Sequence, residues 1–185
     1  MAAAKVGDEE LLARIGDVFR RYGYEGASLR ELSAASGLEK ASLYHRFPGG
    51  KEEMALAIVA RAGEWLEANV FAPLRDLPAA QRVPRAAGKL REFYRNGELW
   101  CTLDVLTLSG SSDAIRAAVR GSYQAWVGAF ARAAREAGLP APEARARAQQ
   151  AIIEIEGSLV ISRVTGDPKI FLRVLQSLPA RLTRV

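Results

Sequence analysis

Residues 28–51, SLRELSAASGLEKASLYHRFPGGK, decide how the N-terminal part of this chain folds. Ser28 and Glu31 have the spacing of a capping box, in which the serine hydroxyl accepts from the N3 amide and the carboxylate accepts from the N-cap amide. This pattern predicts a short helix over Leu29–Ser36. Gly37 is expected to end the helix, because glycine adopts the left-handed conformation that closes a helix without steric cost.

A second short helix is predicted over Lys40–Arg46, and Pro48-Gly49-Gly50 ends it. Leu43 and Phe47 are four residues apart, so they share one face and are expected to point inward. Two short helices joined by a tight glycine turn form a helix-turn-helix, whose second helix enters the major groove of DNA. The side chains left outward on the second helix are those of Lys40, Ala41, Ser42, Tyr44 and His45.

The outward side chains have the chemistry that DNA contacts require. Ser42, Tyr44 and Lys51 are donors of the kind that bind phosphate oxygens. Lys40, Ser42 and His45 can reach base edges. The pattern alone leaves an alternative open, because two short amphipathic helices with a glycine turn are common in all-α proteins. That alternative is an all-α small-molecule-binding module or enzyme in which the helix-turn-helix is incidental.

The run GYEGASLRELSAASGLEKASLYHRFPGGKEEM, residues 23–54, resembles the N-terminal signature of TetR-family transcriptional regulators. The matching features are the aromatic-Gly approach, the serine-capped second helix, the Ala-x-x-x-Gly turn, the Leu-Tyr-His-x-Phe recognition helix and the Lys-Glu pair that opens a long helix. The resemblance extends over residues 8–60 and implies that this segment binds DNA.

Carried over position by position, the resemblance implies two groups of DNA contacts. Ser28, Tyr44 and Lys51 are expected on phosphates, with Lys51 acting from the start of the fourth helix. The residues expected in the major groove are Lys40, Ala41, Ser42 and His45.

Three features depart from the common family pattern. Glu39 stands where a serine or threonine cap is frequent, so the recognition helix is expected to have a poorer cap. Ala41 stands where glycine is frequent. The Pro-Gly-Gly-Lys turn is one residue longer than the commonest form, and it resembles the LmrA/YxaF-like branch of the family.

The composition bounds the class of protein. With 185 residues and an apolar content of 49%, the chain can bury a sizeable core. No stretch of 18 uncharged apolar residues occurs, so no membrane span is expected, and MAAAKVGDEE lacks the apolar core of a signal peptide. The single cysteine, Cys101, rules out an internal disulfide and fits a reducing compartment. The expected location is the cytoplasm.

The net charge of +5 does not by itself indicate a nucleic-acid partner. Residues 1–74 carry nine Lys/Arg and eleven Asp/Glu, whereas residues 75–185 carry seventeen and ten. The part that is expected to bind DNA is therefore not basic overall. The placement of its cations matters more, and four of them lie in the motif: Arg30, Lys40, Arg46 and Lys51.

The remainder of the chain has helical periodicity with breaks at proline and glycine. Pro73 is expected to end the fourth helix, and Pro84 to lie in the first turn of the fifth. The fold class is therefore all-α with about nine helices: a three-helix DNA-binding head in residues 1–50, and a larger ligand-binding and dimerisation domain in residues 51–185. Besides the two helices of the motif, helices are expected at residues 8–22, 51–72, 83–95, 98–108, 113–137, 143–164 and 168–178.

Residues 148–164, AQQAIIEIEGSLVISRV, are apolar almost all round. A helix of this kind needs two partners. One is its own domain, and the other is either its copy in a second subunit or, in a monomer, the rest of a central core. The two-fold symmetry of operators favours a homodimer. The interface is predicted on the last two helices, at Ala148, Ile152, Ile155, Leu159, Phe171 and Leu175.

Four aromatic residues are candidates to line a ligand cavity, although aromatic residues at helical spacing are also common in an ordinary core. These are Trp65, Trp100, Tyr123 and Trp126. Asp104 interrupts the apolar run WCTLDVL, and is expected either to hold a polar or cationic ligand group or to be an exposed or arginine-paired carboxylate. Glu154 and Glu156 raise the same question, with ion pairs to Arg163 or Arg173 as the alternative.

The sequence lacks the residues of a catalytic or metal site. His45 is the only histidine, and it lies on a short exposed helix rather than in a pocket beside a nucleophile. One histidine and one cysteine are too few ligands for a metal ion. Cys101 lies in an apolar stretch and is expected to be a buried, unreactive thiol rather than a redox sensor. No cofactor, metal or enzymatic activity is therefore expected.

These features together favour a ligand-responsive DNA-binding repressor that binds a palindromic operator as a homodimer. Its effector is expected to be small, mostly apolar and planar, because the candidate lining is aromatic. Members of the resembled branch respond to small hydrophobic compounds, some of them flavonoids, which fits this expectation. The sequence leaves open the identity of the effector, the operator sequence, the regulated genes, and the choice between repressor and activator.

Overall fold

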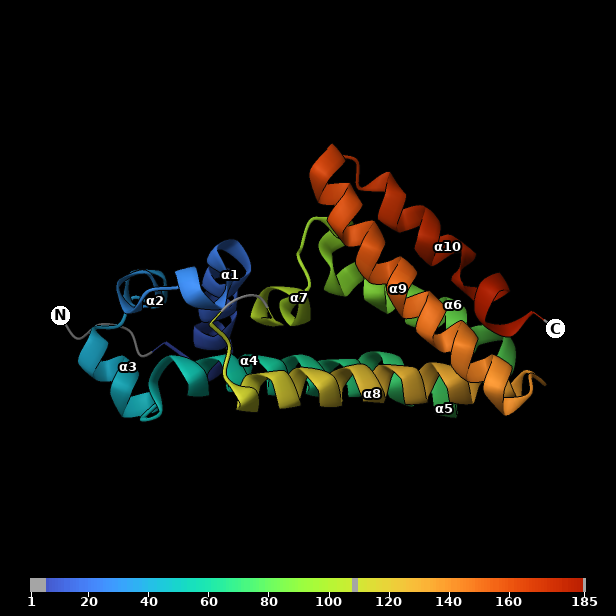
Figure 1. The fold of residues 1–185 in the computed structure, drawn as a ribbon, viewed down its shortest axis with the longest axis horizontal. Coiled ribbons are helices and arrows are strands. Elements are labelled where there is room, and N and C mark those ends of the chain that lie inside the picture. The colour runs from blue at the N-terminus through green and yellow to red at the C-terminus, as the bar shows by residue number, and fades with distance from the viewer. Residues whose placement is uncertain (1–5, 108–109, 185) are drawn as a thin grey trace. The chain divides into compact units, whose positions relative to one another are not determined.

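The computed structural model describes residues 6–107 and 110–184. Within these ranges every regular element is a helix and no strand occurs, which confirms the all-α prediction (Figure 1). When α4, the π-helical turn that follows it and α5 are counted as one helix, the described residues form nine helices and one short 3₁₀ turn.

The chain divides into two compact units. The first unit contains residues 1–62 and 102–120, and the second contains residues 63–101 and 121–185. The first unit therefore includes, besides the proposed head, the start of α4, all of α7 and the start of α8. The functional division into residues 1–50 and 51–185 stays a prediction.

Helix α1, Asp8–Gly26, forms the centre of the first unit. Its first turn is acidic, which suits the positive end of the helix dipole. Gly23 breaks the helical conformation with a φ of 71°, directly after the predicted helix end at residue 22, and one further turn follows it. Tyr22 is exposed. The buried side chains are those of Leu11, Ile15, Val18 and Phe19.

Helices α2, Leu29–Ser36, and α3, Lys40–Arg46, have the predicted limits. α2 packs on both α1 and α3, and Leu32 and Leu43 are fully buried between them. Helix α7, Thr102–Thr107, also packs against α1 (Figure 1). The helix-turn-helix is thus held by α1 within the same compact unit as α7.

The helix predicted over residues 98–108 is wrong at its start, because α7 begins only at Thr102. A 3₁₀ turn, Arg95–Gly97, precedes it, and all three residues of this turn have positive φ angles of 47°, 59° and 99°. Left-handed backbone cannot continue into a right-handed helix, so residues 99–101 are irregular. The predicted end at Leu108 lies outside the described residues.

The prediction that Pro73 ends the fourth helix is wrong. The helix that begins as α4, Gly50–Leu66, continues past this proline. A π-helical turn, Glu67–Phe71, and then α5, Ala72–Asp76, carry the helix onward. The amide of Ala72 donates to the carbonyl of Glu67, five residues back. This wider turn accommodates Pro73, because proline has no N–H to donate and its ring needs room beside the preceding turn.

Helix α6, Ala79–Phe93, starts four residues earlier than predicted, so Pro84 lies inside it rather than in its first turn. Pro78 supplies the extended residue that precedes the helix, with a ψ of 142°. The inward face of α6 packs against α10 and the π-helical turn, which offsets the hydrogen bond that Pro84 cannot make. The buried residues on this face are Val83, Ala86, Ala87 and Leu90.

The last three helices are close to the predicted ones. They are α8, Asp113–Glu136, α9, Ala141–Thr165, and α10, Lys169–Thr183, which continues past Pro179 and so ends later than expected. In the second unit α9 lies beside α10, and α6 packs on α10 (Figure 1). Gly166, with a φ of 68°, ends α9.

The residue assignment for the dimer interface needs correction. All six predicted residues are at most 7% exposed within a single chain, so they belong to the core of the second unit and offer no surface to a partner. These residues are Ala148, Ile152, Ile155, Leu159, Phe171 and Leu175. The opposite face of α9 is exposed, and it carries what is here named the apolar stripe: Ile153, Gly157, Val160, Ile161 and Val164.

Candidate nucleic-acid interface

The N-terminus of α2 is closed by the predicted capping box. The Ser28 amide donates to Glu31 Oε2 at 2.8 Å, and the Glu31 amide donates to Ser28 Oγ at 3.2 Å. The Ser28 backbone N–H, followed by the Ser28 hydroxyl, lowers the pKa of the Glu31 carboxyl below its ordinary value. The Ser28 side chain therefore takes part in the capping box both as an acceptor from the Glu31 amide and as a neighbour of the Glu31 carboxylate.

The turn between α2 and α3 is fixed by several hydrogen bonds. Gly37 has a φ of 72°, and its amide donates to the Ser33 carbonyl at 3.1 Å. The Ser33 hydroxyl donates to the carbonyl of Leu38 at 2.6 Å. From α1, Arg14 Nη1 donates to the carbonyl of Ser36 at 3.1 Å. These bonds satisfy the last carbonyls of α2 and set the direction in which α3 leaves the turn.

Helix α3 presents one buried and one exposed face. Leu43 is fully buried, and Phe47, at the C-cap, is half-buried. Glu39, the N-cap residue, makes no side-chain capping bond, as its departure from the family pattern suggested. The exposed side chains, here named the operator face, are the five that the sequence placed outward: Lys40, Ala41, Ser42, Tyr44 and His45.

Lys51 lies where α4 begins, but its ammonium already has partners in the chain. Its Nζ lies 4.6 Å from the centre of the Tyr24 ring and donates to the Glu25 carbonyl at 3.4 Å. Gly50, with a φ of 66°, makes the turn into α4 that brings Lys51 to this position. The contact between Lys51 and Tyr24 was not predicted from the sequence, because 27 residues separate the two and no local spacing links them.

The cations of the motif divide into two groups. Arg46 pairs with Asp8 at 3.0 Å and donates to the carbonyl of Val6 at 2.9 Å, so it ties the start of α1 to the end of α3. Arg30 and Lys40 are exposed, and neither forms an ion pair with any described residue. Of the four cations in the motif, Arg30 and Lys40 are therefore available to bind a polyanion. Lys51 is available only through the N–H donors of its ammonium that its internal partners do not use.

Two family models match this chain. Residues 11–58 match the model for bacterial regulatory proteins of the tetR family, and residues 83–177, just over half the chain, match that for the C-terminal domain of LmrA/YxaF-like transcriptional regulators. The chain belongs to the TetR family. This TetR-family protein is therefore a DNA-binding transcriptional regulator of the LmrA/YxaF-like branch, and the enzyme alternative is excluded.

Individual proteins are similar to this chain in sequence or in fold. LmrA of Bacillus subtilis, an HTH-type transcriptional regulator, is 26% identical over 95% of this chain and 96% of its own length. A TetR regulator of Legionella pneumophila has the same fold, with a TM-score of 0.84 at 17% identity over 98% of this chain and all of its own. AibR, solved with isovaleryl coenzyme A and operator DNA, matches with a TM-score of 0.61 and 20% identity over 80% of this chain and 85% of its own.

The four predicted aromatic ligand residues all lie in the second unit, but in different surroundings. Trp65 packs on Phe93 with ring centres 4.7 Å apart. The guanidinium of Arg163 lies 4.5 Å from the ring centre of Trp100. Tyr123 is exposed and bonded to Gln149, whereas Trp126 is only 2% exposed. No described ring contact joins two of these four residues.

The three carboxylates in question also have different surroundings. Asp104 is half-buried on α7, in the first unit. Glu154 pairs with Arg181 rather than with Arg163 or Arg173. Glu156 Oε1 accepts from the hydroxyl of Tyr94 at 3.4 Å.

Tyr94 is a buried residue that the sequence reasoning missed. Its hydroxyl also lies 3.8 Å from Cys101 Sγ, and the thiol is buried as expected. Burial, followed by Cys101 and Glu156, raises the pKa of Tyr94 well above its ordinary value. The hydroxyl is therefore a permanent donor inside the second unit.

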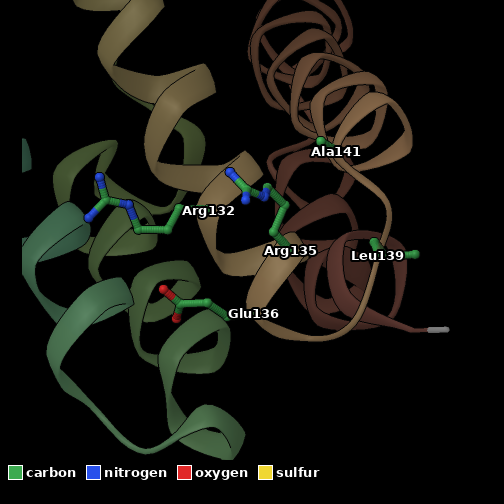
Figure 2. Close-up of a pocket in the computed structure, with 5 residues that line it drawn as sticks. All are labelled: Arg132, Arg135, Glu136, Leu139 and Ala141. Carbon is green, nitrogen blue, oxygen red and sulfur yellow. The ribbon is translucent and has the colours of Figure 1, made fainter.

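One cavity of the second unit is lined by charged residues and does not contain the predicted ligand residues. It has a volume of about 700 Å³ and lies where α8 ends and α9 begins (Figure 2). Glu136 in its lining is paired with Arg82. A lining with three charged side chains suits an apolar effector poorly. The lining residues are Arg132, Arg135, Glu136, Leu139 and Ala141.

Among residues 6–107 and 110–184, no helix is long and apolar enough to cross a bilayer. No three residues of the types His, Cys, Asp and Glu gather in a way that would hold a metal ion within that part of the chain.

Proposed function

We propose that this TetR-family regulator is a repressor that binds a palindromic operator as a homodimer in the cytoplasm and is released by a small, mostly apolar effector. The observation that carries the DNA part of the proposal is the operator face. It places five adjacent exposed side chains on a helix whose direction is fixed by a hydrogen-bonded turn. A short rigid helix with such a face fits the major groove.

The roles of the DNA-contacting residues follow from their chemistry and position. Ser28 and Tyr44 donate to phosphates, and so does Lys51 from the N-terminus of α4, where backbone amides also favour an anion. Lys40, Ser42 and His45 contact base edges, because each can donate a hydrogen bond. Ala41 contributes a methyl-sized surface that suits contact with thymine.

The apolar stripe on α9 supports the homodimer. Ile153 is 62% and Val164 is 74% exposed, which is costly for large apolar side chains in water. Members of the stripe recur at intervals of three and four residues, so they lie on one face of the helix. A second copy of the chain, related by a two-fold axis, covers each stripe with the other. The two heads can then bind two half-sites about one DNA turn apart.

The effector part of the proposal is supported by the aromatic side chains of the second unit. Trp65, Trp100 and Trp126 contribute large apolar surfaces there, and Tyr123 adds a hydroxyl. Such surfaces favour a planar, mostly apolar compound. Asp104 lies in the first unit, and its predicted contact with the ligand stays a prediction.

The test of DNA binding compares Lys40→Ala with Lys169→Ala, a matched control that removes an exposed lysine from α10. Duplexes from the DNA beside the gene are titrated by fluorescence anisotropy at several salt concentrations. The wild type and the control should bind one palindromic duplex selectively. Lys40→Ala should lose about 1–3 kcal/mol at one base pair and tolerate substitutions there. An equal loss on every duplex would place Lys40 on the backbone, and no selective binding by the wild type would refute the proposal.

A further inference from the structure

The cavity where α8 ends and α9 begins has an excess of positive charge in its lining (Figure 2). Its three charged residues, Arg132, Arg135 and Glu136, all come from the last two turns of α8. Arg132 and Arg135 are three positions apart, so their side chains lie on one face of the helix. At about 700 Å³ the cavity has the size of a small-molecule site. It therefore offers two guanidinium groups to a single guest molecule.

The carboxylate in the lining is already used by another helix. Glu136 is four positions from Arg132, a spacing at which opposite charges on one helix attract each other. In this structure Glu136 instead pairs with Arg82 of α6. Arg82 is itself held, because its Nε donates to the carbonyl of Leu77 at 2.6 Å. The pairing with α6 therefore keeps the negative charge of Glu136 from neutralising Arg132.

The two guanidinium groups of the lining have no partner in the part of the chain that the structure describes. Neither the Arg132 nor the Arg135 side chain forms an ion pair or a hydrogen bond with residues 6–107 or 110–184. Glu143, in the first turn of α9, pairs with Arg147 at 2.6 Å and does not neutralise them. Arginine keeps its charge at any physiological pH. An anion can therefore bind both groups without breaking an existing ion pair.

We propose that this cavity binds a sugar phosphate, whose phosphate group accepts hydrogen bonds from Arg132 and Arg135. A phosphate monoester carries a charge of about −1.5 to −2 at pH 7, which balances two guanidinium groups, whereas one carboxylate balances only one. Each guanidinium can donate two parallel N–H bonds to phosphate oxygens. The site is separate from the proposed effector site, because none of the four aromatic candidates lines this cavity.

The rest of the guest follows from the size and polarity of the lining. The cavity is much larger than a phosphate group alone, so it has room for the group that carries the phosphate. Leu139 and Ala141 are the two apolar residues of the lining, and Leu139 is only 6% exposed. So little apolar surface favours a hydroxylated body over a hydrocarbon. A pentose phosphate has both features.

The experiment titrates ribose 5-phosphate, ribose and inorganic phosphate into the full-length protein by isothermal titration calorimetry at about 150 mM salt, where diffuse surface attraction is screened. Ribose 5-phosphate should bind, inorganic phosphate should bind more weakly, and ribose should not bind. The arginine Nε–H signals of ¹⁵N-labelled protein are recorded in parallel. Ribose 5-phosphate should shift two of them, and Arg132→Ala and Arg135→Ala should each remove one of the two.

The arginine variants test the contacts one at a time. Arg132→Ala and Arg135→Ala should each weaken the binding of ribose 5-phosphate about tenfold, the loss expected for one charge-assisted hydrogen bond. Both side chains are exposed, so neither variant should disturb the fold, and circular dichroism checks this. Arg120→Ala is the matched control, since it removes an exposed arginine of α8 that does not line the cavity. It should bind like the wild type.

Glu136→Gln tests the sign of the electrostatic argument. It removes the negative charge from the lining and leaves Arg82 without its carboxylate, so ribose 5-phosphate should bind more tightly. Weaker binding would contradict the proposal, because the carboxylate would then help to hold the guest.

Three further results would overturn the proposal. One is the absence of binding by ribose 5-phosphate at millimolar concentration. Another is an equal loss in Arg120→Ala and Arg132→Ala, which would indicate diffuse attraction to a positive surface. The third is citrate that displaces ribose 5-phosphate at equal or lower concentration, because the site would then prefer carboxylates. If the wild type binds no ribose 5-phosphate and Arg132→Ala loses affinity for every DNA duplex alike, the arginines contact the DNA backbone instead.

Discussion

Lys51 has partners inside the chain, and it is also one of the residues that we propose to bind a phosphate of the operator. Its ammonium rests on the Tyr24 ring and donates to the Glu25 carbonyl, which leaves further donor positions free. The contact with Tyr24 is weak enough to coexist with a phosphate, since an exposed cation–π contact contributes about 0.5–1 kcal/mol. We therefore expect Tyr24 to hold the lysine in place for the proposed phosphate contact.

Replacing Lys51 by alanine should weaken binding to every DNA sequence alike. One fewer phosphate neutralised lowers the slope of log K against log salt by about 1. The measurement is anisotropy titration between 50 and 200 mM salt, a range over which roughly 10³-fold changes are common. Tyr24→Leu should give a smaller loss of affinity with the slope unchanged. An unaltered slope in Lys51→Ala would show that the ammonium stays with Tyr24 and does not reach a phosphate.

At the scale of a single helix, α6 keeps a proline in its interior. Pro84 is the sixth residue of α6, so its missing N–H leaves the carbonyl of Ala80 without its usual partner. The proline itself is exposed, whereas the neighbouring Val83 is buried. Tertiary packing of the inward face therefore holds together a helix that its own sequence interrupts.

Pro84→Ala should stabilise the protein, because it restores a helical hydrogen bond at an exposed position. Proline costs about 3 kcal/mol relative to alanine in a helix interior, and the greater freedom of the unfolded chain returns up to about 1 kcal/mol. We expect a gain of about 1–2 kcal/mol in urea unfolding. Pro78→Ala is the control, since Pro78 precedes the helix and lacks no helical bond. A loss of stability in Pro84→Ala would mean that packing requires the kink.

For the molecule as a whole, burial decides which face of α9 is available to a second subunit. Ile155 is fully buried in one chain and Ile161 is 47% exposed, although both are isoleucines on the same helix. The first holds the fold together. Ile161 still has exposed surface, which association with a second subunit can bury.

Ile161→Glu should give a folded monomer. In the dimer a glutamate in the apolar stripe would be buried without a partner, which costs about 3–5 kcal/mol, whereas in the monomer it is solvated. Sedimentation should show the monomer mass, with unchanged helical circular dichroism and weaker operator binding. Ala117→Glu, at an exposed position on α8, is the control. A stable dimer of Ile161→Glu would move the interface off the apolar stripe.

Ile155→Glu provides the contrast. Its charge would lie in the core of a single chain, so we expect unfolding or aggregation rather than clean dissociation. The two variants together therefore distinguish an effect on association from an effect on folding.

The sequence by itself determined the helix-turn-helix. Ser28, Glu31 and Gly37 form hydrogen bonds with residues only a few positions away. Local spacing was therefore enough to predict the limits of α2 and α3 and the outward face of α3. Local chemistry of this kind is fully present in the order of the residues. The same holds for the all-α class, which follows from periodicity.

Only the tertiary structure decided which side of each later element is covered. Helix α9 is apolar on nearly every side, so its sequence could not distinguish the buried Ile155 from the exposed Ile161. Pro73 and Pro84 read as boundaries, yet the π-helical turn and the packing of α6 keep both inside helices. The contacts of Lys51 with Tyr24 and of Trp126 with Phe71 join residues far apart in the chain. Such contacts depend on how distant helices pack, and no local spacing encodes them.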